Sequence, residues 1–94
     1  MSKSLELTKE CCEFFKSCQN QGVGFCIKNA QKINFYNYIY AMLKSEKCKE
    51  VIVDNLNTTI EELYNYCESS GCFEIKISDL LSVMNKMNKS KQTA

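Results

Sequence analysis

A chain of 94 residues is the length of one small domain, and folded chains of this size bury only roughly 60 to 65% of their unfolded surface. Its 12 basic and 11 acidic residues balance, so charge gives no indication of a nucleic-acid partner. The longest uncharged apolar stretch, Ile33 to Leu43, is far shorter than the ~20 residues of a membrane helix, and residues 1–6 lack an apolar run. Composition therefore predicts one cytoplasmic domain over residues 1–94, with neither nucleic acid nor a membrane as its partner.

The first half of the chain has mainly helical patterns. A first helix is predicted over Ser4–Gln19, capped by its serine, with Gly22 just past its end. Residues Val23–Ile27 alternate as in a short strand, or form an irregular loop. A second helix is predicted over Tyr36–Lys44, and Ser45 can cap a short third helix that ends near residue 56.

The start of the next helix has the clearest boundary signal. Thr58 with Glu61, or Thr59 with Glu62, matches a capping box, in which each partner satisfies a backbone amide of the other. The helix is predicted to end near Gly71, because glycine adopts the left-handed conformation that closes helices.

The last quarter of the chain is predicted to hold a brief strand and a final helix. Phe73, Ile75 and Ile77 alternate as in a strand, and Ser78 can cap a helix that carries several leucines and methionines. Residues 89–94 are expected to fray. The predicted fold class is thus all-α, with four to five helices.

Cysteine is abundant and histidine is absent. The seven cysteines are Cys11, Cys12, Cys18, Cys26, Cys48, Cys67 and Cys72, an odd number that favours reduced thiols. Cys11 and Cys18 share a helical stripe with Leu7 and Phe14, as core residues do. Cys-x2-Cys pairs, Cys-His pairs and glycine-rich phosphate loops do not occur. We therefore expect no metal, no cofactor, no catalytic residues and no enzymatic activity.

Two segments resemble the EF-hand superfamily of calmodulin and myosin light chains. The segment Lys32–Ile39 is similar to the family's Ile-Asp-Phe-x-Glu-Phe-Leu, which would place Ile33 in a β-bridge and Asn37 at the twelfth loop position. A second loop would cover Glu68–Asp79, with Ile75 at the bridge position. The resemblance implies an EF-hand-like helix-loop-helix pair joined by a short two-stranded β-bridge.

The calcium ligands of that family are missing from both loops. Ca²⁺ prefers carboxylate or amide oxygens at the first, third, fifth and twelfth positions of the loop. The second loop offers only Glu68, Ser70, Cys72 and a short Asp79, and the first loop has no carboxylate. The loops are therefore degenerate, and neither is expected to bind calcium.

The resemblance implies a calcium-independent module that grips an amphipathic, IQ-type helix of a larger protein, such as a myosin-type heavy chain. Flexible methionine and aromatic side chains line such grooves. The residues expected there are Phe15, Ile39, Met42, Leu63, Met84 and Met87. Core packing explains them equally well, because periodicity does not separate a groove from a core. Basic residues of the target could meet the acidic side chains Glu10, Glu13, Glu46, Glu50, Glu61 and Glu62.

Two other classes of function stay open. A small helical inhibitor or adaptor of a virus or mobile element would act by contact with a protein and would also lack ligand motifs. A helix-turn-helix DNA-binding protein could use Thr59–Asn88, but its second helix carries only Lys86 and Lys89 as cations, which gives few phosphate contacts.

Overall fold

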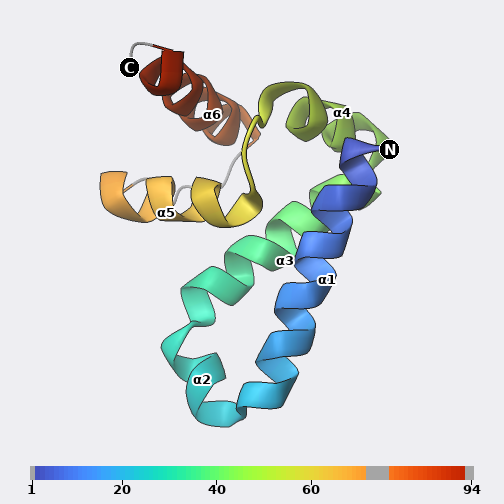
Figure 1. The fold of residues 1–94 in the computed structure, drawn as a ribbon, viewed down its shortest axis with the longest axis vertical. Coiled ribbons are helices and arrows are strands. Elements are labelled where there is room, and N and C mark those ends of the chain that lie inside the picture. Colours follow the sequence, from blue (N-terminus) through green and yellow to red (C-terminus); the bar gives the residue numbers. More distant parts are fainter. Residues whose placement is uncertain (1, 72–76, 93–94) are drawn as a thin grey trace.

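The computed structural model describes residues 2–71 and 77–92, which form six helices. These are α1 (Lys3–Gln21), α2 (Val23–Lys28), α3 (Ala30–Lys44), α4 (Glu46–Asn55), α5 (Ile60–Ser70) and α6 (Ile77–Gln92). Helices α1 and α3 run antiparallel as a hairpin that α2 closes at one end, while α4, α5 and α6 gather toward its other end (Figure 1). The described residues contain no strand, so the all-α prediction is confirmed.

The predicted β-bridge is wrong at Ile33, which lies inside α3, and its proposed partner Ile75 lies outside the described residues. The segment predicted as a strand or loop, Val23–Ile27, is helical, and α3 begins at Ala30 instead of Tyr36. The predicted first loop, in which Asn37 is the twelfth residue and residue 26 the first, is therefore helical except at Asn29. A short strand needs a neighbouring strand to satisfy its amides, whereas a helix satisfies its own, and no partner strand lies in the described chain.

The serines that were predicted to cap helices indicated the start of α1 and of α6 only to within about one turn. Helix α1 begins at Lys3, so Ser4 lies inside it and does not cap it. Likewise α6 already includes Ser78, which was predicted as its cap. That helix continues to Gln92, through residues predicted to fray. A serine is tolerated in a first turn as well as at a cap, which explains the shifts.

The predicted ends of α5 are confirmed. The Thr59 side chain accepts a hydrogen bond from the backbone N–H of Glu62 at 3.1 Å. Gly71 adopts the left-handed conformation with φ 71° and ψ 16°, and its N–H donates to the carbonyls of Cys67 and Glu68. Ser45 occupies the N-cap position of α4, as predicted, although its side chain accepts no capping hydrogen bond.

One hydrophobic core joins the hairpin to the remaining helices. Its most buried members come from α1, α3, α4, α5, α6 and the α4–α5 connection: Cys11, Phe35, Ile39, Ile52, Leu56, Ile60, Leu63 and Met84. Aromatic pairs fasten α1 to α3, since Phe14 stacks on Tyr36 with ring centroids 4.0 Å apart. At the far side of the core, the Asn88 amide donates to the carbonyl of Asn55 at 2.8 Å and fastens α6 to the end of α4. No helix in the described part of the chain is both long enough and apolar enough to cross a lipid bilayer.

Candidate functional site

Five of the six side chains predicted to line a partner groove are buried in the core. They are Ile39, Met42, Leu63, Met84 and Met87. The sixth, Phe15, is partly exposed and packs edge-on against Tyr40, with ring centroids 5.7 Å apart. These five residues could touch a partner only if the core opened. Core packing, the alternative that the sequence left open, therefore accounts for them in this structure.

The described residues of the degenerate loop belong to two different helices. Glu68 and Ser70 lie in the last turns of α5, where Glu68 accepts a hydrogen bond from the Tyr64 hydroxyl at 3.2 Å. Asp79 lies in the first turn of α6, and Cys72 lies outside the described residues. Among the residues that the structure describes, no group of three or more His, Cys, Asp or Glu side chains could hold a metal ion.

An open cleft of about 710 Å³ lies between the N-terminal half of α1 and the turn that leads into α5. Its walls are formed by Lys3, Glu6, Leu7, Lys9, Glu10, Glu13, Asn57, Thr58, Thr59, Glu61 and Glu62. The lining contains five glutamates and two lysines, so it carries an excess of negative charge. We call this feature the acidic cleft.

The α1 wall follows from helical spacing. Glu6, Glu10 and Glu13 are separated by four and three residues, which places them on one face of a helix. Leu7 lies beside them and is buried in the core, which fixes the orientation of that face. The Lys3 ammonium donates to the carbonyl of Leu56, so the mouth of the cleft is tied to the end of α4.

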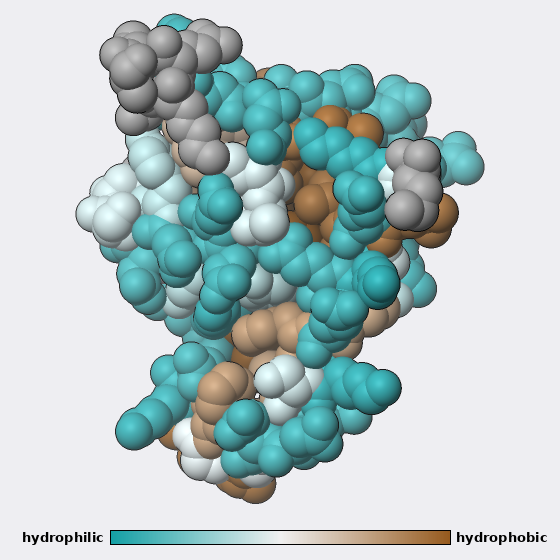
Figure 2. All heavy atoms as spheres, in the orientation of Figure 1, coloured by the Kyte–Doolittle hydropathy of each residue, from teal (hydrophilic) through white to brown (hydrophobic). Residues whose placement is uncertain are grey.

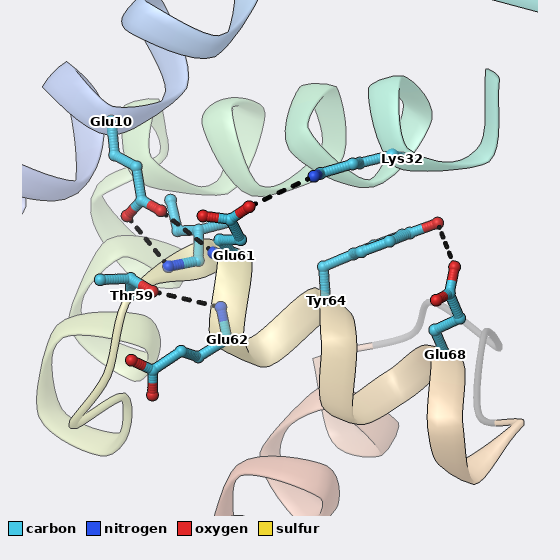
Figure 3. Close-up of polar contacts among 8 residues, drawn as sticks. Glu10, Lys32, Thr59, Glu61, Glu62, Tyr64 and Glu68 are labelled. Carbon is cyan, nitrogen blue, oxygen red and sulfur yellow. Dashed lines mark hydrogen bonds and ion pairs between the residues drawn. The ribbon is translucent and has the colours of Figure 1, made fainter. Parts of the chain in front are cut away.

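Glu10 joins the two walls (Figure 3). Its two carboxylate oxygens accept hydrogen bonds from the backbone N–H groups of Ile60 at 2.9 Å and Glu61 at 3.0 Å. Thr59 accepts from the third amide, that of Glu62, so the first three amides of α5 are satisfied by side chains. A carboxylate at this position also interacts favourably with the positive end of the helix dipole. The role of Glu10 is therefore to position α5 against α1.

Lys32 of α3 lies on the other side of Glu61. Its ammonium is 3.5 Å from the Glu61 carboxylate, and it lies 5.6 Å and 5.7 Å from the ring centroids of Phe14 and Tyr64. Glu61 is therefore partly neutralised from within the fold. By contrast, Glu6 and Glu13 are exposed and make no ion pair with the described residues, so their charge is directed at the solvent.

The buried thiols behave as core side chains. Burial, with a smaller contribution from the neighbouring Glu10 charge, raises the pKa of Cys11 to about 12, so its thiol stays protonated at neutral pH. Burial also raises the pKa of Cys18. Both residues are buried in α1, which confirms their prediction as small core hydrophobes.

Sequence reasoning located part of this site. Of the six acidic residues expected to meet a basic target, Glu10, Glu13, Glu61 and Glu62 line the cleft. The other two, Glu46 and Glu50, lie on α4 and do not line it.

Sequence reasoning missed Glu6 and the turn at residues 57–59. The spacing of Glu6, Glu10 and Glu13 carried a detectable signal for a charged helix face. Nothing local indicated that this face would lie against the start of α5, because the two segments are about fifty residues apart along the chain.

No protein-family model, no curated protein and no solved structure matches this chain, so membership of the EF-hand superfamily stays a prediction.

Proposed function

We propose that this protein is a calcium-independent binding module whose acidic cleft takes a basic, amphipathic segment of a larger protein, of the kind found in IQ-type helices. The observation that carries this proposal is the pair of exposed carboxylates of Glu6 and Glu13, which line an open cleft and make no ion pair with the described residues. Four of the six acidic residues that the sequence suggested for a basic target, Glu10, Glu13, Glu61 and Glu62, line the same cleft.

The geometry of α1 suits a helical ligand. Glu6 and Glu13 are two turns apart, a span of roughly 10 Å along the helix axis. A target helix with Lys or Arg at positions i and i+7 would present cations at the same spacing. Each exposed ion pair contributes little, about 0.2 to 1 kcal/mol, so we expect modest affinity that falls as salt rises.

Binding at the cleft requires no metal ion. The oxygens of Glu10, which would be the most enclosed ligands for a cation, are already occupied by two backbone amides. Charge complementarity between the cleft and a basic helix acts without any conformational change driven by calcium. We therefore expect equal affinity in calcium and in a chelator.

The test is titration of the full chain with a fluorescently labelled, amphipathic basic peptide, followed by fluorescence anisotropy. The double variant Glu6→Gln/Glu13→Gln should raise the Kd about two- to thirtyfold, the loss expected for two exposed ion pairs. The matched control is Glu46→Gln/Glu50→Gln, which removes the charges of two exposed glutamates of α4. Glu46 lies in the first turn of α4, as Glu6 lies in the first turn of α1, so each double variant removes one charge from the start of a helix. This control should bind like the unmodified protein.

Equal affinity for both double variants would contradict the cleft as the binding site. A requirement for calcium would contradict the mechanism. If no basic peptide binds in low salt, the alternative function, an adaptor or inhibitor that contacts a globular partner, becomes the better explanation.

A further inference from the structure

The closed end of the α1–α3 hairpin exposes apolar side chains that the core does not use. Val23 is 76% exposed and Ile27 is 73% exposed, and their spacing of four residues puts them on one side of α2. Figure 2 shows apolar residues at the lower end of the molecule, where Figure 1 places α2. We call residues 22–29 the α2 tip.

The fold itself does not explain these residues. Helix α2 contains no buried residue, and Phe25 is only partly exposed. A single exposed valine or isoleucine is ordinary, but two on one side of a six-residue helix make a small apolar surface at the most projecting part of the hairpin (Figure 1).

The charges around the tip have one sign. Between Phe14 and Gln31 the only charged residues are Lys16 and Lys28, and both side chains are exposed. The other polar residues of this stretch are uncharged: Ser17 and the amides Gln19, Asn20, Gln21 and Asn29. The tip is therefore apolar with a basic border, whereas the cleft near the opposite end of α1 is acidic.

We propose that the α2 tip docks on an anionic lipid surface. Val23 and Ile27 enter the boundary between headgroups and acyl chains, while Lys16 and Lys28 lie among the headgroup phosphates. A small apolar tip can insert into a lipid interface because the interface is deformable. The positive charges of Lys16 and Lys28 complement anionic headgroups. With one short helix in contact, binding is reversible and depends on both the apolar residues and the anionic lipid.

The charge distribution also sets the orientation. Gln21 lies eight residues after Glu13, the cleft glutamate of α1 nearest to the tip, and fifteen after Glu6. These are rises of roughly 12 Å and 22 Å, both longer than the Debye length of about 8 Å at physiological salt. An anionic surface attracts the basic tip and repels the acidic cleft, so the molecule stands on its tip with the cleft directed away from the lipid. Docking therefore leaves the cleft open, and the two binding events can be measured separately.

The first test is flotation of the full chain with vesicles of phosphatidylcholine alone or mixed with phosphatidylserine. The unmodified protein should float with the mixed vesicles and not with phosphatidylcholine alone. Val23→Ser/Ile27→Ser should lower the bound fraction about tenfold, since both apolar contacts are lost. Leu5→Ser is the matched control, because Leu5 on α1 is 68% exposed and lies outside the tip. Circular dichroism verifies that every variant is folded.

A second measurement uses the absence of tryptophan from the chain. Ile27→Trp introduces a single indole whose emission should shift to the blue on addition of mixed vesicles, while Leu5→Trp should show no shift. Failure of the unmodified protein to float, or equal flotation of the Val23→Ser/Ile27→Ser variant, would overturn the proposal. Self-association in lipid-free buffer that disappears in that variant would also overturn it, because the tip would then bind a second copy of the chain.

Discussion

At the scale of single residues, Glu10 contributes more to the fold than its position on the rim of an acidic cleft suggests. It accepts hydrogen bonds from the backbone amides of Ile60 and Glu61, on an element far away in the sequence. We expect Glu10→Ala to lower the free energy of unfolding by about 1 to 3 kcal/mol, the range for hydrogen bonds to a charged acceptor whose partners lose it. Urea unfolding followed by circular dichroism measures this loss.

Glu13→Ala is the control for that experiment. Glu13 lies one turn further along the same cleft wall, is exposed and makes no ion pair with the described residues, so its loss should change stability by less than about 0.5 kcal/mol. Glu10→Gln keeps one acceptor oxygen and should fall between the two. Equal stability of the Glu10→Ala and Glu13→Ala variants would mean that the contact between α1 and α5 is not formed in solution.

Residue identity alone predicted some of these roles. The capping box fitted either Thr58 with Glu61 or Thr59 with Glu62, and the structure has the second: the Thr59 side chain accepts from the amide of Glu62. The role of Glu10 could not be predicted, since its partners are backbone amides that belong to no motif.

At the scale of elements, the end of α5 requires a glycine at residue 71, whereas the interior of α2 does not require one at residue 24. Gly71 ends α5 with φ +71°, where a side chain is strained whatever space surrounds it. Gly71→Ala should therefore lower the free energy of unfolding by about 1 to 2 kcal/mol.

The matched control is Gly24, inside α2. Its φ is not in the left-handed region, and a Cβ there would meet nothing within 4 Å. Gly24→Ala should leave stability unchanged or raise it by up to about 1 kcal/mol, because alanine favours the helix. Chemical unfolding of both variants tests the pair. A Gly71→Ala variant as stable as the parent would show that α5 ends differently in solution.

Element types were predictable where a helical stripe was long. The helices around residues 4–19 and 60–70 appear close to the predicted places, and the one predicted over 36–44 exists but begins six residues earlier, at Ala30. Their apolar residues recur with helical spacing. Val23–Ile27 was wrong as a strand because alternation over five residues also fits a helix with an i, i+4 pair. Ile33 was wrong as a bridge residue because the family resemblance gave it a strand that the chain does not form.

At the scale of the whole molecule, buried acids of high pKa should make the fold sensitive to alkali. The pKa of Cys11 rises from 9.0 to about 12, and burial also raises that of Tyr36 above 10.0. At a pH between the unfolded and the folded pKa of each group, Cys11 and Tyr36 are deprotonated in the unfolded chain and protonated in the folded chain. Stability is therefore full below pH 9 and falls as the pH rises toward 12.

Each proton released on unfolding lowers the free energy of unfolding by about 1.4 kcal/mol per pH unit within this window. Urea unfolding at a series of alkaline pH values measures the slope. Cys11→Ala removes one of these titrating groups and should give a shallower slope, although its overall stability is lower. A stability that does not change above pH 9 would contradict the burial of both groups.

The sequence by itself determined the all-α class, the two ends of α5 and the core character of Cys11 and Cys18. Each of these depends on spacing or on capping within a few residues, and interactions between residues so close together can be predicted from the sequence. Only the tertiary structure decided that Met84 and Leu63 belong to the core, that Glu6 and Glu13 face the same cleft as Glu61, and that the α2 tip is uncovered. Burial and exposure depend on which helix faces pack together, and that choice is made by contacts between residues far apart in the sequence.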